Sequence, residues 1–402
     1  MATDQTVDLD KAHARVREAI SGLEPLLRDV SRDLHSHPEI GFEEYHAAER
    51  LTGELQRAGF SVEQPIAGLE TAFQGHFGTP GRHPRVAILM EYDALPGVGH
   101  ACGHNLIAAG GLGAAIATAR ALPDMAGELL AIGTPGEEGK GGKIYEVEAG
   151  VFQDVDAALM FHPGTHNWTI RHATASAHLT MKFYGKAAHA AGAPEKGINA
   201  LNALIHTFVQ IDALRQHMSE TSRIHGIITH GGDAPNVVPE YAEGSFLVRS
   251  LTVTGVEELT ERVLNCARGA ALAAGARVEF ELGKTYAERK NNGVLADRFA
   301  EYLTATGETV EPPVLRGGTG SSDIGNVSLV LPTIQPYMAI AAPDVPGHSR
   351  AMAEAAGSER GQVAMLHVAE ALAHVAVDLL ATPAFVEEAW ERFRTTGPDL
   401  PL

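Results

Sequence analysis

Three short, nearly continuous apolar runs constrain the fold of this chain more than any other feature. They are Val86–Met90, Glu128–Ile132 and Ala157–Phe161, and stretches of helical character separate them. Strands that are buried on both faces of a parallel sheet have this composition, because neither of their faces meets water. The runs therefore predict an α/β fold with a mixed, largely parallel sheet flanked by helices.

Each of the three runs leads into polar, titratable residues. Glu91-Tyr92-Asp93 follows the first run, Glu137-Glu138 follows the second, and His162 follows the third. In open α/β sheets, ligands bind outside the carboxyl ends of the strands. We therefore expect these side chains to lie together at one edge of the sheet.

The middle of the chain has a different pattern. Residues 177–288 read as strand, helix, two strands, helix and strand, which is the order of a ferredoxin-like α+β domain. A helical pattern at 9–36 precedes the sheet, and another at 359–380 closes the chain. We therefore predict one main domain, formed by residues 1–176 and 289–402, with a second domain inserted at 177–288.

Charge and composition exclude several classes of protein. The 402 residues include 31 basic and 50 acidic residues, so the net charge is −19, and nucleic acid is not an expected partner. The longest run of small or apolar residues, Leu106–Ala119, is too short to span a bilayer, so no membrane contact is expected. With two cysteines and no signal peptide at Met1, we expect a cytoplasmic protein.

The densest group of candidate metal ligands is the segment His100-Ala-Cys102-Gly-His104, which lies in a glycine-rich loop. In an extended loop, Cys102 and His104 face one point and offer sulfur and nitrogen ligands suited to zinc, manganese or cobalt. A buried cysteine beside a helix cap explains the same residues without a metal. Cys102 as a covalent nucleophile is a third hypothesis, although it gives no role to the acidic pair at 137–138.

Two carboxylates and two further histidines add to this group. Adjacent side chains at a strand end diverge, so one of Glu137 and Glu138 can bind a metal while the other acts as a general base. An acidic first turn of a helix is the alternative for this pair. His162 ends a buried strand and His348 lies in a turn-rich loop, and each of them by itself is also compatible with a structural role.

The order of these motifs along the chain matches that of a known family. The matching segments are His37-Pro38-Glu39, Asp93-Ala94-Leu95-Pro96, His100-Ala-Cys102-Gly-His104, Glu137-Glu138, His162, Gly185-Lys-Ala-Ala-His189, Asn236-Val-Val-Pro239 and His348-Ser349. They cover nearly the whole chain, and their spacings agree as well. The chain resembles the aminoacylase and carboxypeptidase group of dinuclear metallo-amidohydrolases, especially its indoleacetyl-amino-acid hydrolase branch.

This resemblance implies two divalent metal ions in each subunit. The expected ions are zinc or manganese, with cobalt as a further alternative. The residues that match the family's metal ligands are Cys102, His104, Glu138, His162 and His348. Cys102 would bridge the two ions. Glu137 would be the general base and later the proton donor to the leaving amine. Asp93 aligns with an acidic position beside the ligands.

The inserted domain resembles the family's lid, which also forms the homodimer interface. His189 matches a lid histidine that reaches the partner's site and stabilises the tetrahedral oxyanion. Asn236 and Arg249 match positions that hold the free carboxylate of the substrate, and a guanidinium offers a bidentate fork to such a group. Arg249 could otherwise be an ordinary charge on an edge strand.

One segment departs from the pattern of many relatives. Where they have Gly-Ser-Glu-Asp-Phe, this chain has Gly320-Ser321-Ser322-Asp323-Ile324. With Glu91-Tyr92-Asp93, this form looks more like aminobenzoyl-glutamate hydrolase subunits and the dipeptidases that cleave β-alanyl amides of basic amino acids. The resemblance thus implies a metal-dependent amidohydrolase whose activated water cleaves N-acyl, aminobenzoyl or aminoacyl amino acids. A non-catalytic metal-binding scaffold of the same fold is the alternative from another class.

Overall fold

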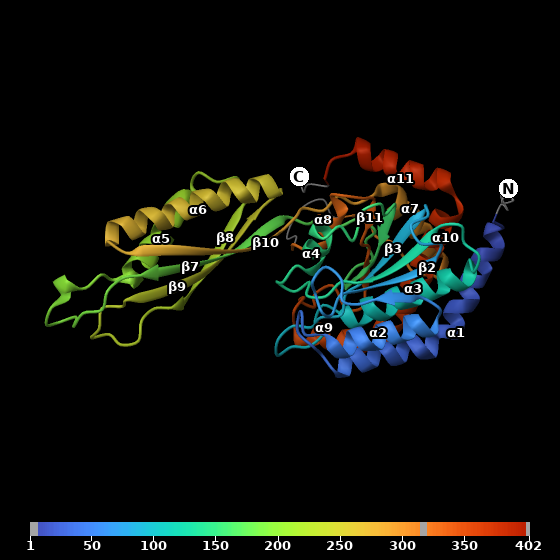
Figure 1. Cartoon of the computed structure of the whole chain (residues 1–402), viewed down its shortest axis with the longest axis horizontal. Helices are drawn as coiled ribbons and strands as arrows, with labels where there is room; N and C mark the ends of the chain where they lie inside the picture. Colours follow the sequence, from blue (N-terminus) through green and yellow to red (C-terminus); the bar gives the residue numbers. More distant parts are fainter. Residues whose placement is uncertain (1–6, 314–319, 399–402) are drawn as a thin grey trace. The chain divides into compact units, whose positions relative to one another are not determined.

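The computed structural model describes residues 7–313 and 320–398, and the contacts among them divide the chain into two compact units (Figure 1). Unit 1 holds the described residues up to His172 and those from Arg289 onward, except Gly320 and Ser321. Unit 2 holds Ala173–Glu288 together with Gly320 and Ser321. Unit 2 is therefore almost entirely an insertion in the sequence of unit 1.

Unit 1 is built on a six-stranded sheet in the order β1-β2-β4-β3-β5-β11. Its central strands are β3 (Arg85–Met90), β4 (Glu128–Gly133) and β5 (Ala157–Leu159), which run parallel to one another and are almost completely buried. At one side of the sheet, β11 (Thr333–Ile334) pairs in parallel with β5. At the other side, β2 (Phe73–Gly78) is antiparallel to β4, and β1 (Ser61–Glu63) is antiparallel to β2. The predicted mixed, largely parallel sheet is confirmed.

Three long helices of unit 1 pack against one another: α1 (Leu9–Ser36), α3 (His104–Ala121) and α10 (Glu359–Ala381). Both α3 and α10 also contact β3. Among the described residues, α10 is the one helix that is long and apolar enough to cross a membrane, but 78% of its apolar window is buried inside the protein. Burial of this kind is typical of a core helix. The other helices of unit 1 are α2 (Tyr45–Arg57), α4 (Gly142–Glu148), α7 (Gly293–Ala305), α8 (Ile324–Ser328), α9 (Arg350–Gly357) and α11 (Pro383–Thr395).

Two details of unit 1 differ from the sequence prediction. The third apolar run leaves the central sheet after Leu159, and the chain continues as β6 (His162–Gly164), which pairs in parallel with β12 (Tyr337–Ala339). A final helix, α11, was not predicted. Among its residues only Phe385 and Ala389 are buried.

Unit 2 is a four-stranded antiparallel sheet covered by two helices. Its strands are β7 (Ala175–Tyr184), β8 (Arg223–His230), β9 (Tyr241–Ser250) and β10 (Arg277–Tyr286), in the order β10-β7-β9-β8. Helices α5 (Ala200–Arg215) and α6 (Val253–Ala274) pack on this sheet and on each other. The predicted ferredoxin-like fold is confirmed.

Candidate metal centre and active site

The predicted site residues of unit 1 lie at the carboxyl ends of its central strands. Asp93 follows β3, Glu137 and Glu138 follow β4, and His162 begins β6 shortly after β5. Because the three central strands are parallel, these ends meet at one edge of the sheet. His104 reaches the same edge as the first residue of α3.

A glycine shapes the loop that precedes α3. Gly103 has a φ of 71°, in the left-handed region that glycine adopts at the lowest cost. A Cβ atom at this position would lie 2.7 Å from Cγ of Pro163, the neighbour of His162. The glycine therefore lets the loop that carries Cys102 and His104 pack directly against the segment that carries His162.

Three groups of potential ligand atoms lie at this edge, and one of them consists of His104, Glu137 and Glu138. The other two groups share one atom. The first group consists of Cys102, His104 and His162, and the second consists of Cys102, Glu138 and His348. Within each group, all the potential ligand atoms lie within 4.8 Å of one another. The Sγ atom of Cys102 belongs to both groups, so the arrangement could hold two cations side by side.

The chemistry of these side chains fits divalent cations. Nε2 of His104 and Oε1 of Glu138 are buried atoms that form no hydrogen bond with any residue in the described ranges. A buried polar atom without a partner is costly, and a bound cation removes that cost. Sulfur, nitrogen and carboxylate ligands together suit zinc and its neighbours in the first transition series.

Asp93 connects the two groups through hydrogen bonds. Its Oδ1 lies 2.9 Å from Nδ1 of His104, and its Oδ2 accepts a hydrogen bond from the backbone N–H of Glu138 at 2.9 Å. Burial would raise the pKa of Asp93, but the neighbouring His104 ring and these hydrogen bonds hold it below its ordinary value. The same contact raises the pKa of His104 despite the burial of the ring.

Glu137 and His162 are both shifted toward their neutral forms. Burial, followed by the charges of Glu91 and Glu138, raises the pKa of Glu137 well above its ordinary value. Burial, followed by the charge of His104, lowers the pKa of His162 well below its ordinary value. A protonated carboxyl group can donate a proton. A neutral imidazole can bind a metal.

His348 is the most exposed member of the group. Its side chain is 62% exposed, its backbone has a φ of 57°, and its Nε2 lies 3.7 Å from Oε1 of Glu138. Cys102, in contrast, is half-buried, and burial and then the charge of Glu138 raise the pKa of its thiol. The thiol of Cys102 therefore stays protonated unless a cation replaces its proton.

The three predicted lid residues belong to unit 2. His189 and Asn236 lie next to each other, because the chain around His189 bridges to Val237 and the N–H of Ala190 donates to the carbonyl oxygen of Asn236. Both of their side chains are exposed. Arg249 lies on β9, where its Nη1 donates to Oγ of Ser321 at 2.8 Å.

Three buried charged residues lie together beside the site, and two of them, Lys143 and Asp323, were not predicted to lie there. The Nζ atom of Lys143 lies 2.5 Å from Oε1 of Glu91 and 2.8 Å from Oδ1 of Asp323. Glu91 was expected at this edge as part of Glu91-Tyr92-Asp93, whereas Asp323 stands out in the sequence only within a segment that departs from the pattern of many relatives. Lys143 is the second residue of α4 and follows two glycines, and the local composition gives no indication of burial.

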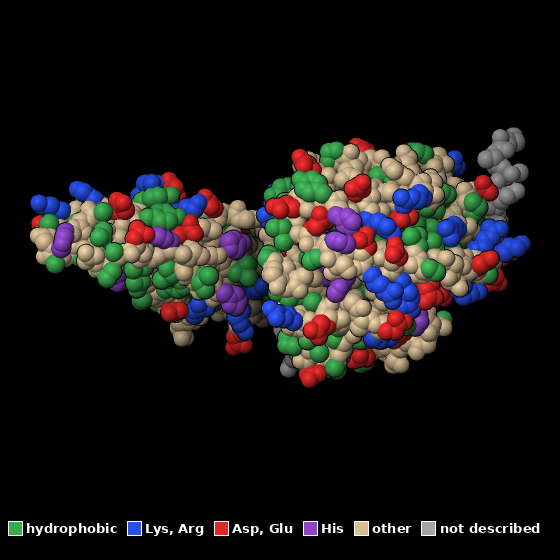
Figure 2. Space-filling view, turned by 90° about the horizontal axis from the view of Figure 1, so that it is seen from below, with side chains coloured by type: hydrophobic (Ala, Val, Ile, Leu, Met, Phe, Trp, Pro, Cys, Tyr) green, Lys and Arg blue, Asp and Glu red, His purple; other side chains and the backbone are tan. Residues whose placement is uncertain are grey.

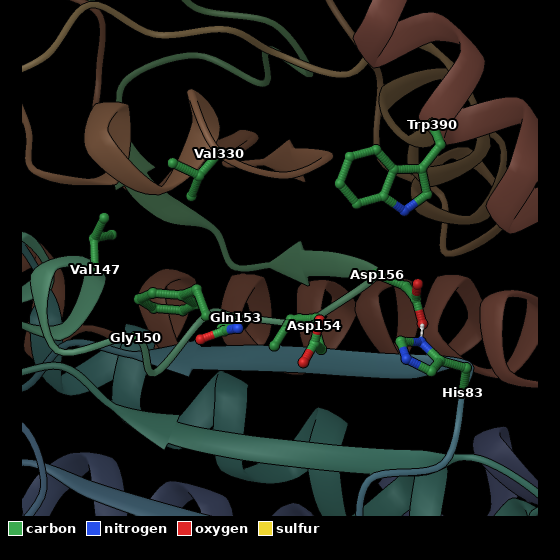
Figure 3. Close-up of a pocket in the computed structure, with 10 residues that line it drawn as sticks. His83, Val147, Gly150, Gln153, Asp154, Asp156, Val330 and Trp390 are labelled. Atoms are coloured by element: carbon green, nitrogen blue, oxygen red, sulfur yellow. Dashed lines mark hydrogen bonds and ion pairs between the residues drawn. The ribbon is translucent and has the colours of Figure 1, made fainter.

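A separate hollow lies at the opposite end of the strands. It has a volume of about 480 Å³, and Figure 3 shows His83, Asp156 and Trp390 among its lining residues. His83 and Asp156 precede β3 and β5, and Nδ1 of His83 lies 2.7 Å from Oδ2 of Asp156. No predicted site residue lines this hollow. It is therefore distinct from the group at the carboxyl ends.

Comparison with known proteins agrees with this geometry. Residues 171–274 match the family model of a peptidase dimerisation domain. The mouse Xaa-Arg dipeptidase is 38% identical over 408 residues, which cover 98% of this chain and 94% of that protein. A p-aminobenzoyl-glutamate hydrolase subunit of Escherichia coli K12 is 36% identical over 73% of this chain and 65% of its own length. The chain belongs to the M20 peptidase family.

Solved structures with the M20 fold are similar over most of their length. An aminobenzoyl-glutamate utilization protein from Klebsiella pneumoniae has a TM-score of 0.72 at 22% identity, covering 92% of this chain and 98% of that one. A dinuclear metal-binding peptidase of the M20 family from Bacillus subtilis has a TM-score of 0.63 at 21% identity, covering 89% and 99%. The resemblance inferred from the sequence motifs is confirmed, and this M20 protein is a hydrolase of the metallopeptidase and amidohydrolase class.

Proposed function

We propose that this M20 hydrolase is a dinuclear amidohydrolase, with Cys102 as a ligand that two divalent ions would share. The observation that carries this proposal is that Sγ of Cys102 belongs to two different groups of ligand atoms. The other proposed ligands are His104 and His162 for one ion, and Glu138 and His348 for the second. Zinc, manganese and cobalt are the ions that best suit this mixture of donors.

Glu137 is the proposed general base and proton donor. When bound, two such ions polarise the amide carbonyl and make a nearby water molecule acidic. Glu137 takes a proton from that water on its carboxylate and passes it to the nitrogen of the leaving amine. The raised pKa of the buried Glu137 supports this role, because it makes the carboxylate a stronger proton acceptor.

A thiol amidase with Cys102 as its nucleophile is the alternative mechanism. A nucleophilic cysteine needs a lowered pKa, whereas burial and the neighbouring carboxylates raise the pKa of Cys102. The thiol mechanism also gives no role to Glu138 and His348, which lie close to the same sulfur atom. Both observations favour the metal-dependent mechanism.

We propose substrates in which an acyl or aminoacyl group is joined by an amide bond to an amino acid. The names of the relatives support this class, since they include a dipeptidase and an aminobenzoyl-glutamate hydrolase. Arg249 and Asn236 would hold the free carboxylate of the amino acid. Among the described residues, Arg249 contacts the Ser321 hydroxyl but no carboxylate, so its guanidinium can take an anionic ligand.

A homodimer formed through unit 2 is the proposed assembly. Residues 171–274 match a dimerisation domain, and β8 is an edge strand whose backbone could pair with another strand. Ile227 on β8 is 65% exposed, and Val209 on α5 is 58% exposed. His189 would then act at the site of the partner. Acidic and basic side chains are interspersed on the face shown in Figure 2. The cytoplasmic location and the absence of nucleic-acid and membrane partners stay predictions.

A chelation experiment with a substrate panel tests the proposed function. The protein is treated with a chelator, reloaded with zinc, manganese or cobalt, and supplied with N-acyl amino acids, aminobenzoyl-glutamate and β-alanyl dipeptides. We expect the released amine to disappear on chelation and to return with at least one ion. The substrates that are cleaved define the acyl group and the amino acid.

Two results would contradict the proposal. Full turnover in the metal-free protein would favour the thiol mechanism, and loss of that turnover on alkylation of Cys102 would establish it. A metal-loaded protein that cleaves no amide in a broad panel would favour a non-catalytic scaffold. The metal-loaded Glu137→Gln variant is the matched control, because it should bind both ions and release amine far more slowly than the wild type.

A further inference from the structure

Lys143 is the centre of a buried ion-pair network in unit 1. Its ammonium group lies between Oε1 of Glu91, at 2.5 Å, and Oδ1 of Asp323, at 2.8 Å. Its backbone N–H also donates to Oδ2 of Asp323 at 3.0 Å. The side chains of all three residues are completely buried. The network joins the end of β3, the second residue of α4 and the residue before α8.

The charges within this network do not balance. It contains one ammonium group and two carboxylates, and burying an ion away from water is costly unless other charges compensate it. Lys143 binds only one of the two oxygens of Glu91. The other oxygen, Oε2, is buried and forms no hydrogen bond with any residue of the described ranges. The second carboxylate charge is therefore not compensated by Lys143 and has to be compensated by a group outside the network.

The unused oxygen of Glu91 faces the candidate metal centre. Oε2 of Glu91 lies 3.4 Å from Nε2 of His104, the buried ring nitrogen that also has no hydrogen-bond partner among the described residues. Nδ1 of His104 forms a hydrogen bond with Asp93, so Nε2 is the ring nitrogen that can bind a cation. A cation on that nitrogen would have the carboxylate of Glu91 close beside it.

We infer that Lys143 is a positioning residue of the metal centre: it holds Glu91 so that the free oxygen of that carboxylate faces the ion on His104, and Asp323 holds Lys143 in turn. This inference rests on the proposed function, because it takes the ion to be there. It also gives a role to Glu91 and Asp323, which are 232 positions apart in the sequence and which the proposed mechanism does not use.

Metal binding by two neutral variants tests the inference without using activity. Lys143→Met removes the ammonium group and keeps the length of the side chain, and Glu91→Gln removes the charge that faces His104. We expect each variant to bind one of its two ions at least about tenfold more weakly in competition with a chromophoric chelator. We also expect the visible spectrum of the cobalt-loaded protein to change. Lys140→Met, at an exposed lysine in the turn before α4, is the matched control and should leave both readouts unchanged.

The possible outcomes separate the inference from the proposed function. A Lys143→Met protein that is folded by circular dichroism, binds both ions with wild-type affinity and keeps the wild-type cobalt spectrum would overturn the inference. If Lys143→Met does not fold, Glu91→Gln decides alone, and wild-type affinity with an unchanged spectrum in that variant would also overturn it. Wild-type protein that binds no divalent ion would instead refute the proposed function, and this inference with it.

Discussion

Nδ1 of His104 lies 2.9 Å from Oδ1 of Asp93, and both side chains are buried at the edge of the central sheet. This contact leaves Nε2 of His104 as the ring nitrogen that can bind a cation. The second oxygen of Asp93 accepts a hydrogen bond from the backbone of Glu138. One carboxylate therefore orients candidate ligands from both groups around Cys102.

Asp93→Asn should weaken metal binding. Asp93 uses both oxygens as acceptors, whereas asparagine offers one oxygen and one N–H₂ donor, so the variant must lose the contact to either His104 or Glu138. We expect an affinity loss of about 10- to 100-fold for at least one ion, measured by competition with a chelator. Unchanged affinity for both ions would contradict the orienting role of Asp93.

Glu137→Gln should separate catalysis from metal binding. The amide has the size of the carboxyl group but cannot take up a proton, so we expect kcat to fall by about 10²- to 10⁴-fold. The metal content should stay that of the wild type, because Glu137 is not a proposed ligand. Metal analysis and amine release are measured on the same sample. A variant with near-normal kcat would remove Glu137 as the base.

Cys102→Ser should affect both ions together. A serine hydroxyl does not ionise near neutral pH, so it is a poor replacement for a bridging thiolate. We expect the affinity for both ions to fall, with less than one ion retained per chain after dialysis against a weak chelator. Retention of two ions would show that the sulfur is not the bridge, and loss of only one would place Cys102 on a single ion.

Mixing two inactive variants tests the role of His189. If His189 acts at the site of the partner, a dimer of one Glu137→Gln chain and one His189→Ala chain contains one intact site. Statistical mixing should then restore up to about a quarter of the wild-type activity, since half of the dimers are mixed. Mixed dimers are verified by two different affinity tags. No recovery in verified mixed dimers argues that His189 acts within its own chain, or has no catalytic role.

Glu128→Gln should change the dependence of stability on pH. The buried Glu128 carboxylate contacts His76 and Arg85, each at 2.7 Å, and accepts from the N–H of Gly81. Burial would raise its pKa, but these partners hold the pKa of Glu128 below its ordinary value of 4.5. A lowered carboxyl pKa stabilises the folded state above pH 4.5, and this contribution is lost as the pH falls below that value.

The measurement for Glu128 is urea unfolding of metal-free protein between pH 7 and pH 3. At pH 7 we expect the variant to be less stable by about 2 kcal/mol, since hydrogen bonds to a charged group are lost. The difference from the wild type should shrink as the pH falls through 4.5 and below. Glu63→Gln, at an exposed position, is the control. A difference that stays constant across this range would show that the charge of Glu128 is not what stabilises the fold.

Several elements could be predicted from the sequence because their signals are local. The apolar runs of β3 and β4 and the long amphipathic pattern of α1 coincide with the elements of the structure. The ferredoxin-like order of unit 2 was predicted from the order of its strand and helix segments, and β9 has the alternating burial of a strand with one covered face. Helix α11 and the break between β5 and β6 were not predicted, and the break depends on the pairing of β6 with β12, a segment far along the chain.

The sequence by itself determined the family, the layout of strands and the identity of the candidate ligands, because motif order and hydrophobic pattern are properties of the chain. Only the tertiary structure decided that one sulfur atom, that of Cys102, lies within reach of two separate sets of ligands. It also decided that Lys143 is buried between Glu91 and Asp323. Whether a lysine is solvated or buried depends on residues that the fold brings together from far along the chain, and no local pattern records it.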